Sequence, residues 1–186
     1  MARKSKGLWL ILLGCALLVV AGGWYAYNLA ENATAERQAA SLVAQLDSEL
    51  PDASAVDTVT LDGETFCGKL TIPVLEIELP VYDEWSYKRL KTAPCRYVGR
   101  VATDDIIIAA HNYHSHFGQL NRLRIGDEIS FTDASGKTHR YTVCELTMLD
   151  GTAVTDMQSG GWDLTLFTCT KSGKQRVTVR CERDVK

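Results

Sequence analysis

Eight short apolar or alternating runs fill the sequence after Phe66 and constrain the fold more than any other feature. They are rich in residues that favour strands, and polar or glycine-containing segments separate them. Short strands with little helix between them are typical of a closed or nearly closed β-barrel. We therefore predict a mainly β domain with eight strands and short helices. The strands are expected near residues 67–72, 75–82, 97–101, 106–111, 128–132, 140–146, 164–169 and 176–181.

The amino-terminal segment has a different composition. Basic residues within positions 1–6 precede an uncharged, apolar stretch of 24 residues at positions 7–30. At about 1.5 Å per residue, a helix of that length crosses a bilayer. Because the basic residues precede the span, the positive-inside rule places residues 1–6 in the cytoplasm and the rest of the chain outside. We expect residues 7–30 to be a single-pass transmembrane signal anchor in the cell membrane.

Two other interpretations of this segment compete with an anchor. A cleavable signal peptide fits the small residues of Ala33-Thr34-Ala35, but its apolar region is usually only about 7 to 15 residues long. A lipoprotein signal fits Leu12-Leu13-Gly14-Cys15, but the apolar stretch continues well past that cysteine.

A helical pattern follows the apolar stretch. Residues 31–50 are rich in Ala, Glu, Gln and Leu, and apolar residues recur at helical spacing between positions 42 and 50. Pro51 ends the pattern, since proline disfavours helical geometry in the residue before it. We expect residues 31–65 to form a stalk helix and linker that hold a barrel of residues 66–186 off the membrane.

The charge balance excludes one class of partner. All 23 acidic residues follow the apolar stretch, whereas the basic residues there number 17, the total of 20 less the three within positions 1–6. The external part therefore carries about 6 excess negative charges, and we expect it to bind no nucleic acid.

The segment Leu164-Thr165-Leu166-Phe167-Thr168-Cys169 delivers a cysteine to the end of a predicted strand, where reactive groups are displayed. A thiol of ordinary pKa, about 8.5, is mostly protonated at neutral pH, so a nucleophilic cysteine needs a base or a cation beside it. His111 ends another apolar run and can supply that base. The other external cysteines, Cys67, Cys95, Cys144 and Cys181, allow two disulfides or buried thiols, and the strand patterns around Cys144 and Cys181 favour burial.

An acyl-transfer reaction also needs donors directed at the oxygen that becomes negative, and a guanidinium supplies them. Arg176 and Arg180 lie on the same face of one predicted strand, roughly 13 Å apart, so both cannot reach one oxygen. Six residues separate Cys169 from Arg176, and a hairpin there sets Arg176 opposite the cysteine. We therefore choose Arg176, and an outward-facing surface arginine is the competing interpretation.

The spacing of three histidines, His111, His114 and His116, also invites a zinc site. Acidic ligands are not interleaved with them and no second ligand cluster follows, so we expect no metal and no cofactor. Only His111 ends the apolar run. We expect His114 and His116 to be loop residues over the substrate groove.

The run Thr165-Leu166-Phe167-Thr168-Cys169 resembles the Thr-Leu-x-Thr-Cys strand end of the sortase family of cysteine transpeptidases. Upstream, residues 68–82 resemble the first two family strands, and His111-Asn112 with Phe117 and Gly126-Asp127 resembles the histidine loop. The resemblance covers about residues 66–186. It implies a sortase-like β-barrel with Cys169, His111 and Arg176 as catalytic residues.

The resemblance also implies a reaction. Such an enzyme cleaves an LPxTG-like sorting signal of a surface protein through a thioester and transfers that protein to an amine of a lipid-linked cell-wall precursor. Thr168, Trp162 and Thr170 are implied to bind substrate. The short loop before Leu164 and the lack of an aromatic Asp-Pro motif before Phe66 favour a class B/D-like enzyme over a pilin-type one.

Two other functions compete with transpeptidation. A hydrolytic cysteine protease would use the same residues, but papain-like enzymes place the cysteine before the histidine, and the caspase Gln-Ala-Cys-x-Gly run is absent. A non-catalytic surface β-barrel or adhesin would leave Cys169 as a buried thiol. Modification of Cys169 by a thiol-directed trap distinguishes a transpeptidase or a protease from an inert barrel.

Overall fold

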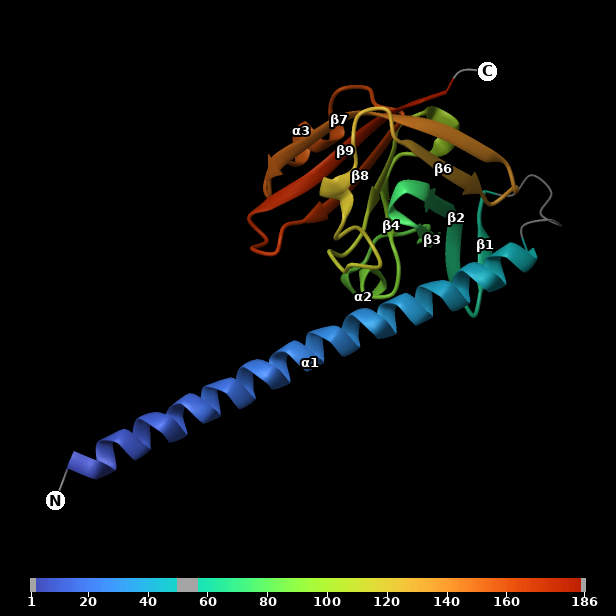
Figure 1. Cartoon of the computed structure of the whole chain (residues 1–186). Helices are drawn as coiled ribbons and strands as arrows, with labels where there is room; N and C mark the ends of the chain where they lie inside the picture. The colour runs from blue at the N-terminus through green and yellow to red at the C-terminus, as the bar shows by residue number, and fades with distance from the viewer. Residues whose placement is uncertain (1–2, 50–56, 185–186) are drawn as a thin grey trace. The chain divides into compact units, whose positions relative to one another are not determined.

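The computed structural model describes residues 3–49 and 57–184, and the chain divides into two compact units, Met1–Thr34 and Ala35–Lys186. Helix α1 runs from Arg3 to Glu49 (Figure 1). Its portion from Gly7 contains an 18-residue window of mean hydropathy 2.1 whose side chains are all exposed. By length and composition this helix can cross a bilayer, a property that signal sequences share.

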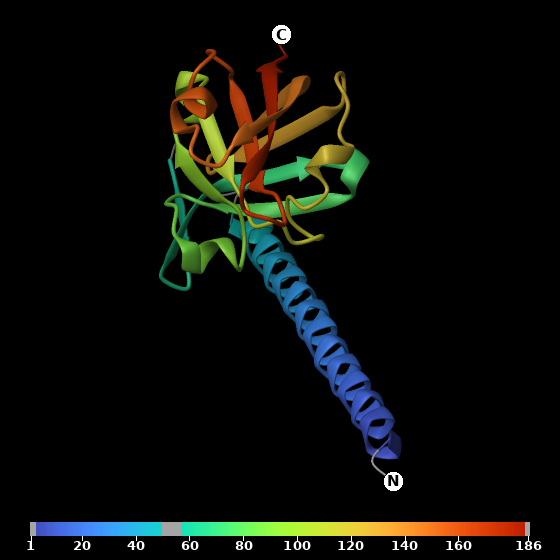
Figure 2. The same ribbon diagram turned by 90° about the vertical axis from the view of Figure 1, so that its left-hand side faces the viewer.

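The described residues of the second unit form one sheet of nine strands in the order β1-β2-β3-β4-β5-β8-β9-β7-β6. An additional pairing between β2 and β6 closes the last eight strands into a barrel, and Figures 1 and 2 show them curving around a common interior. The strands are β1 Val59–Leu61, β2 Glu64–Ile72, β3 Ile77–Tyr82, β4 Cys95–Val98, β5 Ile106–Ala109, β6 Glu128–Asp133, β7 Thr138–Asp150, β8 Leu164–Cys169 and β9 Gln175–Arg183.

Short helical segments connect the strands. They are α2 Tyr87–Leu90, α3 Val154–Gln158 and the 3-10 turns η2 Pro73–Leu75, η3 Val101–Thr103 and η4 Leu120–Arg122. The prediction of a mainly β, eight-stranded barrel with short helices is confirmed. Several local features differ from it: β1 adds a ninth strand outside the barrel, β4 lies at Cys95–Val98 instead of 97–101, β5 ends at Ala109 instead of residue 111, and β7 extends to Asp150.

Alternation along the strands fills the interior. Leu70, Ile108, Phe131, Tyr141 and Leu166 are almost fully buried in one cluster, as expected where inward side chains of several strands meet. Closure of the barrel depends on Gly68 of β2. Any Cβ there would meet the Phe131 ring on β6 at 2.7 Å, so only glycine allows the two strands to pair at this point.

The carboxyl-terminal part of α1 packs on the barrel within the second unit. Ala35, Ala39 and Leu46 are buried, and Leu42 packs with them at the same helical spacing. Ala39 belongs to the main core cluster, and Leu46 contacts a second cluster that includes Phe66 and Tyr82. An ion pair between Asp47 and Lys69 of β2 adds a polar contact. The residues from Ala35 therefore form part of the barrel domain.

Candidate active site

Strand β8 places Cys169 at its end. The preceding residues, Leu164 through Thr168, are all buried, whereas Cys169 is exposed. Among the described residues from Ala35 onward it is the only exposed cysteine, since Cys67, Cys95 and Cys181 are buried and Cys144 is half-buried. None of the six cysteines forms a disulfide. The burial expected for Cys181 is confirmed, and Cys169 is the thiol that a substrate can reach.

Arg176 lies directly across from Cys169. The two residues are partners in the antiparallel register of β8 and β9. The guanidinium carbon of Arg176 is 5.4 Å from the centroid of the Phe167 ring, a cation–π contact on the neighbouring strand. Its Nε and Nη1 atoms are buried and donate no hydrogen bond to any described residue. Two donors of the residue paired with Cys169 therefore have no acceptor in the described part of the chain.

Arg180 is committed elsewhere. Its Nη2 donates a hydrogen bond of 2.6 Å to the backbone carbonyl of Asp156 in α3, and its Nη1 lies 3.4 Å from a carboxylate oxygen of Glu145. The structure thus separates the two arginines as the strand spacing predicted, with Arg176 opposite Cys169 and Arg180 holding α3.

His111 reaches the same edge from β5. This strand is parallel to β8, with Ala109 opposite Phe167, so the residues that follow both strands emerge at one end of the sheet. The hydroxyl of Thr168 donates a hydrogen bond of 2.9 Å to the carbonyl of Ala110, and this bond ties β8 to the residue before His111. The three predicted catalytic residues therefore come from neighbouring strands and share one edge of the barrel.

The loop after His111 folds back on itself. The rings of His111 and Tyr113 are stacked, with centroids 4.1 Å apart and planes inclined by 13°. Tyr113 in turn contacts His116, whose ring centroid is 5.4 Å away. His116 is fully buried, so the expectation that it lies over the groove is wrong, whereas His114 is exposed. Burial, with the nearby charge of His111, lowers the pKa of His116 to about 4.

The three residues implied to bind substrate have different surroundings. Thr168 is buried and its hydroxyl is occupied by Ala110, as described above. Thr170 is half-buried in the β8–β9 turn, where its backbone N–H donates to the carbonyl of Gln175. Trp162 precedes the start of β8 and stacks under Arg180, with the guanidinium carbon 5.9 Å from its ring centroid. Trp162 therefore lies at the opposite end of β8 from Cys169.

A buried apolar layer adjoins the cysteine. Phe167 is two residues before Cys169 and so points to the same face of β8. With Ile107 and Ala109 of β5 and Met157 of α3 it forms a cluster outside the main core. Tyr97 meets the edge of Phe167 at 5.4 Å between ring centroids. Sequence spacing alone does not reveal this layer, because a continuous apolar run does not show which face of the strand lines the barrel interior.

Comparison with known proteins agrees with the fold. Residues 70–184, more than half of the chain, match the sortase domain. This match, together with the closed barrel, assigns the chain to the class of sortase-type cysteine transpeptidases. The chain belongs to the sortase family. No curated protein sequence matches it significantly.

Solved sortase structures resemble the chain in fold. Sortase C1 from Streptococcus agalactiae is 27% identical over 68% of this chain and 72% of its own, with a TM-score of 0.60. Sortase C from Clostridium perfringens SM101 is 20% identical over 81% of this chain and 91% of its own, with a TM-score of 0.58. A Clostridium perfringens sortase D5 transpeptidase is 19% identical over 64% of this chain and 79% of its own, with a TM-score of 0.56. Since C and D enzymes match alike, the class B/D-like assignment stays a prediction.

Proposed function

We propose that this chain is a membrane-anchored transpeptidase that cleaves an LPxTG-like sorting signal and transfers the surface protein to an amine of a lipid-linked cell-wall precursor. Cys169 is the nucleophile, His111 the acid and base, and Arg176 the oxyanion donor. The observation that carries the proposal is the pairing of exposed Cys169 with Arg176, whose Nε and Nη1 have no acceptor among the described residues.

The chemistry proceeds in two acyl transfers. The thiolate of Cys169 attacks the carbonyl carbon of the scissile Thr–Gly bond, and the carbonyl oxygen becomes an oxyanion stabilised by Arg176. Collapse of this intermediate breaks the C–N bond, and the imidazolium of His111 protonates the leaving amine. An incoming amine then attacks the thioester and loses its proton to His111. The products are a new amide and the free thiol.

The apolar layer beside Cys169 supports the strand end from below. Phe167, Ile107, Ala109 and Met157 are almost fully buried, so they hold the surface on which the acyl part of a substrate would lie. Thr170 follows the nucleophile and is our candidate for a direct substrate contact. For Thr168 only the backbone remains available, because its hydroxyl is bound to Ala110. Trp162 would contact a more distant part of a long substrate.

The proposed location follows from the amino-terminal segment. Residues 1–6 lie in the cytoplasm, residues 7–30 cross the membrane, and residues 66–186 are the external catalytic barrel. Residues 31–65 link the two, with α1 packed on the barrel from Ala35 onward. An anchor would place the enzyme on the same surface as the retained tail of its protein substrate and the lipid-linked acceptor. The apolar composition of α1 supports this arrangement.

The test uses the full chain in detergent with a panel of sorting-signal peptides and amine acceptors. Mass spectrometry is expected to show an acyl-enzyme on Cys169, and an amide product when the amine is added. Release of the free acid at the same rate with and without amine would instead identify a hydrolytic protease. Absence of any Cys169 adduct, with a folded protein, would refute the enzyme and favour an inert barrel.

A further inference from the structure

The ring of His111 is held by an aromatic neighbour on its own loop. Tyr113 is 6% exposed and lies face to face with His111, at 4.1 Å between centroids and 13° between planes. A histidine that donates a proton to the leaving amine and accepts one from the incoming amine must keep one ring orientation through the catalytic cycle. A flat ring packed against one face of the imidazole restricts rotation about the Cβ–Cγ bond of His111, whose Nδ1 atom is buried.

Tyr113 is itself supported from behind. His116 is fully buried, its ring centroid lies 5.4 Å from that of Tyr113, and the two planes are inclined by 59°. Neither ring nitrogen of His116 forms a regular hydrogen bond with a described residue. The low pKa of His116 keeps this ring neutral at physiological pH, so it adds no positive charge near His111. His116 thus behaves as a packing residue beneath the histidine loop.

Helix α1 closes this stack. Ala35 is 2% exposed. Its backbone interacts with the buried ring of His116 and partly offsets the lowering of that ring's pKa, so the helix backbone lies beside the ring. One turn later Ala39 is 2% exposed and joins the barrel core. Both positions hold the smallest chiral side chain, which lets the helix backbone approach the loop closely. Helix α1 therefore packs against His116, the residue that supports Tyr113 and through it His111.

We propose that Tyr113 is a positioning residue for His111. We also propose that the packing of α1 against His116, at Ala35, sets the orientation of the Tyr113 and His111 rings. The expected effect on kcat rests on the proposed function. The expected orientation of the His111 ring rests on the stacked geometry alone. Displacement of α1 at Ala35 would then lower the rate of acyl transfer without any change at Cys169 or Arg176.

The first experiment separates ring packing from volume. In the full chain, Tyr113→Leu keeps an apolar side chain but no flat ring, and Tyr113→Phe keeps the ring. Tyr113→Leu is expected to lower kcat about 10-fold with an unchanged KM, because positioning acts on the chemical step. Tyr113→Phe is expected to restore kcat to within about twofold. Equal losses in both variants, or full activity of Tyr113→Leu, would overturn the proposal.

The second measurement needs no turnover. In histidine-labelled protein, the ring protons of His111 are expected at high field because of the stacked tyrosine, and Tyr113→Leu moves them downfield while Tyr113→Phe does not. Unchanged His111 resonances in a folded Tyr113→Leu protein would overturn the stack. An inactive wild type with the expected resonances would instead refute the proposed function and leave the positioning role supported.

The helix is tested with a matched pair. Ala35→Leu inserts three carbon atoms against the loop, whereas Ala44→Leu makes the same change at an exposed position of α1. Ala35→Leu is expected to shift the His111 resonances and to reduce kcat about threefold, with KM unchanged. Ala44→Leu should do neither. Identical His111 spectra for the wild type and Ala35→Leu would show that α1 does not act on the site.

Discussion

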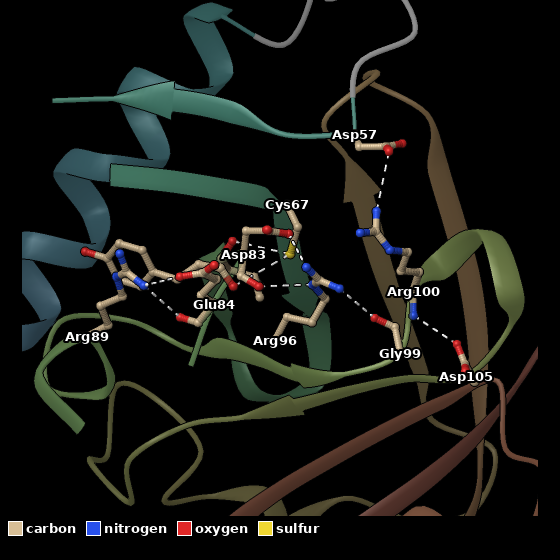
Figure 3. A network of polar contacts seen from close by, with 11 residues as sticks. Asp57, Cys67, Asp83, Glu84, Arg89, Arg96, Gly99, Arg100 and Asp105 are labelled. Carbon is tan, nitrogen blue, oxygen red and sulfur yellow. Dashed lines mark hydrogen bonds and ion pairs between the residues drawn. The ribbon is translucent and has the colours of Figure 1, made fainter. Parts of the chain in front are cut away.

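Two arginines of the barrel, Arg96 and Arg176, differ in what their donors do. Arg96 of β4 places Nη2 at 2.6 Å from a carboxylate oxygen of Asp83 and donates from Nε to the Asp83 carbonyl and from Nη1 to the Gly99 carbonyl (Figure 3). Every one of its nitrogens has an acceptor. Arg176 has none for Nε and Nη1 among the described residues. The guanidinium of Arg96 stabilises the fold, whereas that of Arg176 holds two buried donors with no acceptor in the described part of the chain.

The cysteines beside these arginines differ in the same way. Cys67 lies near Arg96 in Figure 3, donates to the Val81 carbonyl at 3.5 Å, and has its pKa raised to about 12 by burial. Cys169 is exposed at a strand end. A buried thiol with a raised pKa is a poor nucleophile, even beside an arginine. The comparison teaches that an arginine near a cysteine marks a reactive site only when the thiol is exposed and the guanidinium is uncommitted.

The largest expected effect is on the thiol itself. Cys169→Ala should lower product formation by at least about 10⁴-fold, because no other exposed thiol of the barrel can form the thioester. Thermal unfolding should be unchanged, since an exposed side chain contributes little to stability. Cys67→Ala is the matched control and should keep the activity of its folded fraction. Transpeptidation by Cys169→Ala would break the comparison between the two cysteines.

The second test compares the roles of the two arginines. Arg176→Gln should lower kcat about 10² to 10³-fold, the usual cost of an oxyanion donor, with little change in stability. Arg96→Gln should leave kcat per folded molecule unchanged but lower the free energy of unfolding by about 3 kcal/mol, because Asp83 loses its partner. Steady-state kinetics and denaturant unfolding on both variants check this. An unstable, fully active Arg176→Gln would assign that arginine a structural role.

The third test concerns acid. The pKa of His116 is lowered in the folded state, so the unfolded chain binds the extra proton between about pH 6.5 and pH 4. Stability is therefore full above the unfolded pKa and falls with acidification, by on the order of 3 kcal/mol near pH 4. His116→Phe should flatten this part of the pH profile of unfolding. The exposed His114→Phe should not, and equal flattening by both would assign the acid sensitivity to other groups.

The strand pattern was sufficient to predict the barrel and the positions of Cys169 and Arg176. These depend on local alternation and on a six-residue hairpin, which sequence spacing expresses directly. The burial of His116 and the packing of Ala35 depend on contacts between segments about 80 residues apart, which no local pattern encodes. The apolar layer around Phe167 was hidden for a related reason: a strand buried on both faces is a continuous apolar run that does not reveal which face binds a ligand.

The smallest expected effect concerns the link between the two strand ends. Thr168→Val removes the hydrogen bond from the Thr168 hydroxyl to the Ala110 carbonyl and should lower the free energy of unfolding by about 1 kcal/mol. Because this bond holds β5 beside β8 one residue before His111, kcat should fall modestly as well. Thr178→Val in β9 is the matched control, since the Thr178 hydroxyl is buried and has no acceptor among the described residues. Its replacement should leave stability unchanged or raise it slightly. If Thr168→Val and Thr178→Val behave alike in unfolding and in kcat, the hydroxyl of Thr168 does not tie the nucleophile strand to the histidine strand.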